Sequence, residues 1–122
     1  MSMAQNKSIM IFDDEEDILQ LCTIILGRSG YDVFTHTDCR DVIGKITVVS
    51  PSLILLDNKI PDRGGVIACQ TIKNHSGTKD IPVVYFSAHD EVAALSREAG
   101  ADDFLQKPFD IFMLEAIVRK YI

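Results

Sequence analysis

Short apolar runs alternate with stretches of helical periodicity five times along the chain. The runs cover residues 8–12, 31–35, 53–56, 83–86 and 103–105. Between and after them, apolar residues recur every three or four positions; in the first such stretch these are Ile18, Leu21, Cys22 and Ile25. This alternation is typical of a parallel β-sheet covered by helices. We therefore predict an α/β fold, a doubly wound (βα)₅ parallel sheet.

The order of the strands follows from general rules of α/β architecture. Right-handed crossovers leave few topologies for such a chain, and the commonest at this size is the flavodoxin-like order 2-1-3-4-5. The continuously apolar run Leu53–Leu56 fits a central strand buried on both faces. In this order the first and third strands are neighbours, and ligands bind beyond their carboxyl ends. The residues that follow Phe12 and Leu56 are therefore expected to be functional.

Length and composition fit one globular domain. The chain has 122 residues, of which 47% are hydrophobic and 25% are charged. We expect residues 1–7 to be a flexible N-terminal tail and residues 8–122 to form the domain. The three cysteines, Cys22, Cys39 and Cys69, are widely spaced and are expected to be reduced thiols.

The charge balance and the lack of long apolar runs narrow the possible partners. A formal charge of -6 argues against direct binding of nucleic acid and suits a cation site. No apolar run approaches the roughly 18 residues of a membrane span, and the N-terminus lacks the apolar stretch of a signal peptide. We expect a cytoplasmic protein that does not insert into a membrane.

Three carboxylates follow the first and third predicted strands. Asp13 and Asp14 come after Phe12, and Asp57 comes after Leu56. Like charges gathered in one crevice are unfavourable unless a cation joins them, so the cluster predicts a bound metal ion. Oxygen ligands without histidine or cysteine favour a hard cation, first of all Mg²⁺.

Each of these residues also has a purely structural interpretation. Asp14 could be a helix N-cap, and the acidic residues that follow it could simply favour the positive end of a helix dipole. Asp57 could be an ordinary turn residue. Its place after four apolar residues argues instead for a half-buried carboxylate with a charged partner. An aspartate beside Mg²⁺ can act as a nucleophile toward phosphorus and form an acyl phosphate.

Two further strand ends carry side chains that suit a phosphoryl group. Ser87 follows the fourth apolar run, and Lys107 follows the fifth. A hydroxyl can donate a hydrogen bond to a phosphoryl oxygen, and an ammonium group offers a compact positive charge. Taken alone, Ser87 could be a cap or turn residue and Lys107 a solvated lysine. Their joint placement makes the functional interpretation the stronger one.

Together these segments resemble the response-regulator receiver family of two-component signalling, over nearly the whole chain. The resemblance rests on Ile11-Phe12-Asp13-Asp14-Glu15, on the segment from Leu55 to Gly65, on Phe86-Ser87-Ala88, on Ala99-Gly100-Ala101-Asp102-Asp103-Phe104 and on Lys107-Pro108-Phe109. All five predicted strand ends match together. The resemblance implies a flavodoxin-like receiver domain that takes a phosphoryl group from a sensor histidine kinase or a histidine phosphotransfer protein.

The resemblance also implies a role for each matching residue. Asp57 corresponds to the phosphorylated aspartate, and Asp13 and Asp14 to the acidic pair that holds Mg²⁺. The main-chain carbonyl of Lys59 corresponds to a further metal ligand. Ser87 and Lys107 match the hydroxyl and the lysine that contact the phosphoryl oxygens.

The family likeness further implies a switch and a backbone feature. Phe104 stands at the position of the switching aromatic ring, where Tyr is more frequent; a core aromatic residue without a switching role is the alternative. The Lys107–Pro108 peptide bond is implied to be cis, whereas a trans Pro opening the last helix is the structural alternative.

As a hypothesis, Lys59 and His89 set the lifetime of the acyl phosphate, which autodephosphorylation of Lys59→Ala and His89→Ala would test. The remaining histidines, His36 and His75, are expected to lie on the surface.

The sequence thus predicts a signalling module that catalyses only its own phosphorylation and dephosphorylation, and that acts on no outside substrate. Phosphorylation would change the face formed by the fourth helix, fifth strand and fifth helix, which an unidentified output protein would read. The rival hypotheses are a phosphohydrolase, disfavoured because Asn58 and Lys59 cannot serve as its second acid, and a degenerate receiver that only binds a partner. Whether the chain is a whole protein or a part of a longer one stays open, as do the cognate kinase, the oligomeric state and the lifetime of the phosphoryl group.

Overall fold

Five parallel strands form one sheet, with helices on both of its faces. The computed structural model describes residues 7–60, 64–88, 90 and 92–122. The elements are β1 (Ser8–Phe12), α1 (Glu16–Arg28), β2 (Asp32–His36), α2 (Val42–Val49), β3 (Leu53–Asp57), α3 (Gly65–Asn74), β4 (Val83–Ser87), α4 (Val92–Ala99), β5 (Asp103–Gln106) and α5 (Ile111–Tyr121). The strand order is β2-β1-β3-β4-β5, which confirms the predicted topology.

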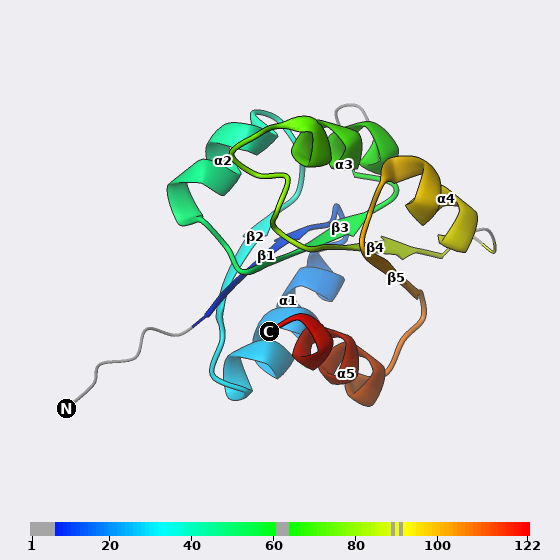
Figure 1. Cartoon of the computed structure of the whole chain (residues 1–122). Coiled ribbons are helices and arrows are strands. Elements are labelled where there is room, and N and C mark those ends of the chain that lie inside the picture. The colour runs from blue at the N-terminus through cyan, green and yellow to red at the C-terminus, as the bar shows by residue number, and fades with distance from the viewer. Residues whose placement is uncertain (1–6, 61–63, 89, 91) are drawn as a thin grey trace.

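The helices divide into two layers around the sheet (Figure 1). One layer holds α1 and α5, and the other holds α2, α3 and α4. Each layer encloses its own apolar cluster, because successive side chains of a strand point to opposite faces. β3 and β4 are buried along their full lengths, as the continuous apolar run Leu53–Leu56 predicts.

Two details differ from the sequence prediction. β2 begins at Asp32 rather than at Tyr31 and runs on to His36. In α1 the buried side chains are Leu19, Cys22, Ile25 and Leu26, whereas Leu21 is 45% exposed. The hydrophobic stripe of α1 is therefore rotated from the predicted one, because Leu19 and Leu26, each one residue after a predicted position, complete an alternative apolar stripe with Cys22 and Ile25.

The remaining local features concern two glycines, the cysteines and the histidines. Gly30 and Gly100, after α1 and α4, have φ of 93° and 80°, a conformation that glycine adopts without strain. The three cysteines are free and buried. His75 is exposed, but His36 is only half exposed, because its ring stacks on Phe12 with centroids 5.4 Å apart. No helix in the described part of the chain is long and apolar enough to cross a membrane.

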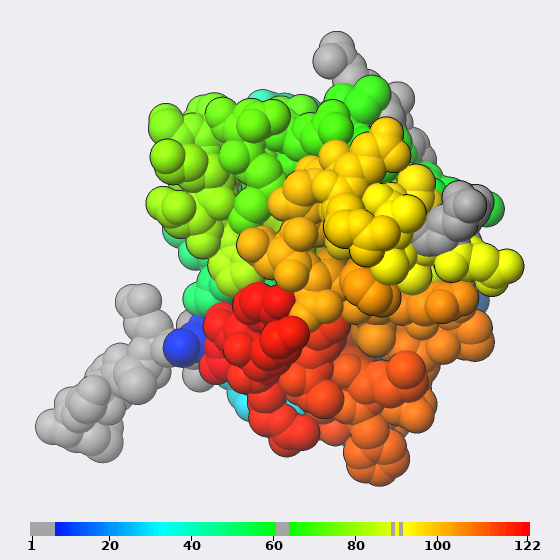
Figure 2. All heavy atoms as spheres, turned by 45° about the vertical axis from the view of Figure 1, so that its right-hand side comes forward, coloured from blue at the N-terminus to red at the C-terminus, as the bar shows by residue number. Residues whose placement is uncertain are grey.

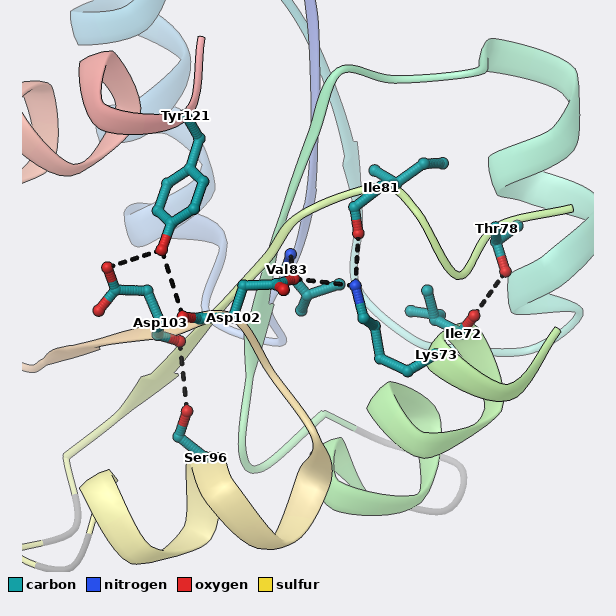
Figure 3. A network of polar contacts seen from close by, with 9 residues as sticks. All are labelled: Ile72, Lys73, Thr78, Ile81, Val83, Ser96, Asp102, Asp103 and Tyr121. Atoms are coloured by element: carbon teal, nitrogen blue, oxygen red, sulfur yellow. Dashed lines mark hydrogen bonds and ion pairs between the residues drawn. The ribbon is translucent and has the colours of Figure 1, made fainter. Parts of the chain in front are cut away.

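A polar network ties the helices together at the edge of the sheet where β4 and β5 begin (Figure 3). We call it the amino-edge network; its side chains are Lys73, Ser96, Asp102, Asp103, Lys120 and Tyr121. The Nζ atom of Lys73 donates to Asp102 and to the carbonyl of Ile81, both at 2.9 Å. Asp102 also accepts from the backbone N–H of Val83 at 2.8 Å. The network therefore joins the end of α3 to the beginnings of β4 and β5.

Tyr121 extends the network to α5. Its hydroxyl donates to the carboxylate of Asp103 at 2.9 Å and to the carbonyl of Asp102 at 3.2 Å. Lys120 donates to the same Asp103 carboxylate at 2.8 Å, and Ser96 of α4 donates to the Asp103 carbonyl. These contacts hold α4 and α5 against β5 at the amino edge.

Candidate functional site

Three carboxylates meet at the carboxyl edge of the sheet, as the sequence predicts. Asp13 directly follows β1, Asp57 is the last residue of β3, and these two strands are neighbours. Asp13 and Asp57 are buried and Asp14 is exposed. One oxygen from each of the three lies within 4.8 Å of the others. A site built from these oxygens is thus open to solvent on the side of Asp14.

Lys107 lies between the two buried carboxylates. Its Nζ atom is 2.7 Å from Asp13 Oδ2 and 2.9 Å from Asp57 Oδ1, and its side chain is only 10% exposed. Burial alone would lower the pKa of Lys107, but the hydrogen bonds to Asp13 and Asp57 outweigh it and raise that pKa. Lys107 is therefore a permanent cation at this edge of the sheet.

One lysine does not neutralise the cluster. Burial raises the pKa of Asp13 despite its hydrogen bond to Lys107, so the ionised form of Asp13 is destabilised here. Glu15 adds a fourth carboxylate, with Oε1 3.4 Å from Lys107 Nζ. In the sequence, Glu15 belongs to the acidic run at a helix start and to a segment that resembles the receiver family, but nothing in its spacing separates it from Glu16.

Backbone groups fix how each carboxylate is turned. Asp57 Oδ2 accepts from the N–H of Lys59 at 3.0 Å, so its two oxygens face different partners. Asp13 Oδ1 accepts from the N–H of Glu15 at 2.9 Å. Glu15 occupies the N-cap position of α1 without a side-chain capping bond, so Asp14 is not the N-cap. This leaves the Asp14 carboxylate available to a ligand.

The remaining predicted site residues lie on the neighbouring strand ends. Ser87 ends β4 and is almost fully buried; its carbonyl accepts from the N–H of Lys107 at 2.8 Å. Phe104 lies in β5 and is 40% exposed. The Lys107–Pro108 peptide bond is cis. The Lys59 side chain is exposed, and His89 lies outside the described residues.

The donor set fits a hard divalent cation. All the candidate side-chain ligands are carboxylates, and their combined charge exceeds that of Lys107. Excess negative charge on oxygen donors favours Mg²⁺ over softer metals. The cluster thus has both the charge and the ligand type that such an ion requires.

Comparison with known proteins places the chain in a family. The sequence model of the response regulator receiver domain matches residues 9–119. The chain belongs to that family. It is 32% identical over 116 residues to Protein PilG of Pseudomonas aeruginosa, covering 93% of this chain and 86% of PilG. It is 38% identical over 106 residues to the Bacillus subtilis alkaline phosphatase synthesis transcriptional regulatory protein PhoP, covering 85% of this chain but only 43% of PhoP.

Solved structures agree with the sequence relatives. A putative response regulator from Chloroflexus aurantiacus superimposes with a TM-score of 0.88 at 25% identity, covering 95% of this chain and 97% of that one. The beryllofluoride-activated receiver domain of Klebsiella pneumoniae RstA gives a TM-score of 0.85 at 26% identity, with 94% and 97% covered. The chain is therefore a receiver domain of two-component signalling, a family whose mechanism is phosphorylation on aspartate.

Two polar residues near the site were given no role of their own from the sequence. Asn58 follows Asp57 directly, and the hydroxyl of Tyr85 in β4 donates to its side-chain oxygen. The only sequence signal for Tyr85 is a single phenol in the apolar run of residues 83–86, and an ordinary core aromatic residue would give the same signal.

Proposed function

We propose that Asp57 is the phosphoacceptor of this receiver domain, which residues 8–122 form. The observation that carries the proposal is the position of Asp57 at the end of β3, within reach of two further carboxylates and of the buried ammonium group of Lys107. A carboxylate turned by the Lys59 N–H and by Lys107 is oriented before any donor arrives. Such orientation lowers the barrier to reaction.

The reaction is transfer of a phosphoryl group from a phosphohistidine. An oxygen of Asp57 forms a bond to phosphorus as the bond between phosphorus and the donor's imidazole nitrogen breaks. That nitrogen keeps the electron pair of the broken bond, and a proton on the ring lets it leave as neutral imidazole. The protein thereby assists only its own modification, and later hydrolysis of the acyl phosphate, without turning over outside substrates.

The other site residues have separate roles. Asp13, Asp14 and Asp57, with the main-chain carbonyl of Lys59, would hold Mg²⁺, which offsets negative charge on the phosphoryl oxygens. Lys107 donates to a phosphoryl oxygen, for which it must release part of its contact with Asp57. The hydroxyl of Ser87, at the end of β4, donates a hydrogen bond to another phosphoryl oxygen. The side chain of Lys59, two residues after Asp57, is exposed, and we propose that it affects the approach of water to the acyl phosphate.

The switching face is proposed to be that of α4, β5 and α5, which Figure 2 shows in gold, orange and red. Movement of Ser87 toward the phosphoryl group would make room for the ring of Phe104, now 40% exposed, to turn inward. Apolar side chains at the start of α5 are already exposed, among them Phe112 at 78%. A change on this face would be read by an output protein rather than by nucleic acid.

The proposed phosphodonors are a sensor histidine kinase and a histidine phosphotransfer protein, since membership of the family implies a histidine donor. The proposed compartment is the cytoplasm. Three free thiols are compatible with its reducing conditions.

Beryllofluoride, which mimics a phosphoryl group on aspartate, tests the proposal. We expect the amide NMR signals of Asp57, Ser87 and Phe104 to shift when beryllofluoride and Mg²⁺ are added together, and not with either alone. Asp57→Asn keeps the size of the side chain and should abolish the response. A wild-type protein that gives no shifts, or an Asp57→Asn variant that gives the same ones, would overturn the assignment.

A further inference from the structure

We propose that Tyr85 is a positioning residue for the phosphoacceptor. Its hydroxyl holds the side chain of Asn58, and Asn58 in turn fixes the peptide group whose N–H orients Asp57. This inference rests on the proposed function of Asp57, but it concerns contacts that can be measured without phosphorylation.

Tyr85 lies in the strand beside the one that ends in Asp57. Its side chain is completely buried, and the register places it opposite Leu56 of β3. Burial raises the pKa of the phenol, so the hydroxyl keeps its proton and acts as a donor. A buried hydroxyl without a partner is costly, and the partner here is the side-chain oxygen of Asn58.

Asn58 is held at three points. Its backbone N–H donates to the carbonyl of Phe86 at 2.8 Å, and its carbonyl accepts from the N–H of Gly65 at 2.9 Å. The Tyr85 hydroxyl provides the third contact, through the side chain. The residue next to the nucleophile is therefore tied to β4 by two bonds and to the start of α3 by one.

The peptide group between Asn58 and Lys59 transmits this anchoring to Asp57. Its oxygen is bound by Gly65, and its N–H donates to Asp57 Oδ2 at 3.0 Å. Because a peptide group is planar, fixing Asn58 fixes the direction of that N–H. The same N–H leaves Asp57 Oδ1 turned toward Lys107.

The packing around the phenol leaves little freedom for the loop to shift. A Cβ atom at Gly65 would lie 2.6 Å from the Asp57 carbonyl, 2.7 Å from Asn58 Cα and 3.0 Å from the Tyr85 hydroxyl. The start of α3, the loop and the phenol are thus in close contact. The Tyr85 hydroxyl is one of the two polar groups at that contact, together with the Asp57 carbonyl.

The first test compares two tyrosines that each lose only a hydroxyl. Tyr85→Phe should lower the phosphorylation rate at saturating acetyl phosphate and Mg²⁺ about tenfold, the size of effect typical of outer-shell partners. The half-saturating concentration of acetyl phosphate should not change, because the contact orients Asp57 and does not bind the donor. Tyr121→Phe also removes a hydrogen-bonded hydroxyl, from the amino-edge network, and should leave the rate unchanged.

The second test asks whether the effect passes through Asn58. Asn58→Ala should slow the reaction as much as Tyr85→Phe, and the double variant should be no slower than either. In the unphosphorylated protein, hydrogen exchange of the Lys59 amide should be faster in both single variants than in wild type and in Tyr121→Phe.

Each result has a defined meaning. Unchanged rate and exchange in Tyr85→Phe would overturn the proposal, and so would independent, multiplying effects of the two substitutions. If the wild-type protein accepts no phosphoryl group and binds no beryllofluoride, the proposed role of Asp57 as phosphoacceptor is wrong. The exchange of the Lys59 amide then still decides whether Tyr85 holds the loop.

Discussion

Two clusters of lysine and aspartate lie at opposite edges of the same sheet, and they differ in how completely their charges are paired. At the amino edge, Lys73 and Asp102 bind each other and also bind backbone groups of Ile81 and Val83. At the carboxyl edge, Lys107 is shared by Asp13, Asp57 and Glu15. The same residue types therefore join structural elements at the amino edge, whereas at the carboxyl edge they form a site with excess negative charge that can bind a cation.

The pKa shifts show the same contrast. Burial raises the pKa of Asp13 at the carboxyl edge, where Lys107 cannot compensate for it. At the amino edge, burial would raise the pKa of Asp103, but hydrogen bonds from Lys120, the Phe104 N–H and Tyr121 outweigh it and lower that pKa. Folding thus disfavours one ionised aspartate and favours the other. The ionised aspartate that folding disfavours lies at the edge that is proposed to bind metal and phosphate.

The largest expected effect comes from removing the cation of the carboxyl edge. Lys107→Met should lower the free energy of unfolding by about 3 kcal/mol in the absence of Mg²⁺, because it leaves two buried carboxylates facing each other. Added Mg²⁺ should recover part of that loss by binding the folded state. Urea unfolding followed by circular dichroism, with and without Mg²⁺, measures both. If Mg²⁺ does not reduce the loss of stability in Lys107→Met, the carboxyl edge is not a cation site and the contrast between the two edges is wrong.

Asp13→Asn should weaken Mg²⁺ binding at least about tenfold. The same substitution should leave the metal-free protein as stable as wild type or more so, because it removes a desolvated charge. Mg²⁺ titration followed by NMR, together with urea unfolding of the metal-free protein, tests the two halves separately. Loss of stability without loss of Mg²⁺ affinity would mean that Asp13 is a structural residue.

Lys73→Met is the matched change at the amino edge. It should lower the free energy of unfolding by about 1–2 kcal/mol, because it leaves the Ile81 carbonyl and one side of Asp102 without their partner. Unlike the loss in Lys107→Met, this one should not depend on Mg²⁺, and phosphorylation by acetyl phosphate should proceed at the wild-type rate. If Mg²⁺ restored the stability of Lys73→Met, the proposed difference between the two edges would be wrong.

The smallest effect concerns the pH dependence of the amino edge. The lowered pKa of Asp103 means that its contribution to stability is present above the unfolded value of 3.8 and is lost as the pH falls through the folded value. Asp103→Asn should cost less than about 1 kcal/mol near neutral pH. It should also flatten the decline in stability below about pH 4. Urea midpoints of both proteins at neutral and acidic pH provide the measurement, and parallel declines would show that Asp103 does not contribute.

Much of the site could be predicted because strand ends can be located from the sequence. Asp13, Asp57, Ser87 and Lys107 each stand just after an apolar run, and parallel strands bring their carboxyl ends together. Which face of α1 is buried was less predictable. Leu21 and Leu19 suit a helix equally well and each belongs to an apolar stripe, but only Leu19 is buried in the folded protein.

The sequence by itself determined the alternation of strands and helices and the residue types at each strand end, because both depend on short-range patterns. The tertiary structure decided the rest. It placed Lys107 between carboxylates that include one 94 residues earlier in the chain, at 2.7 Å. It also joined Tyr85 to Asn58, 27 residues apart, and so gave a buried phenol a contact with the residue that follows Asp57. Such contacts depend on strand register and helix packing, which no local pattern specifies.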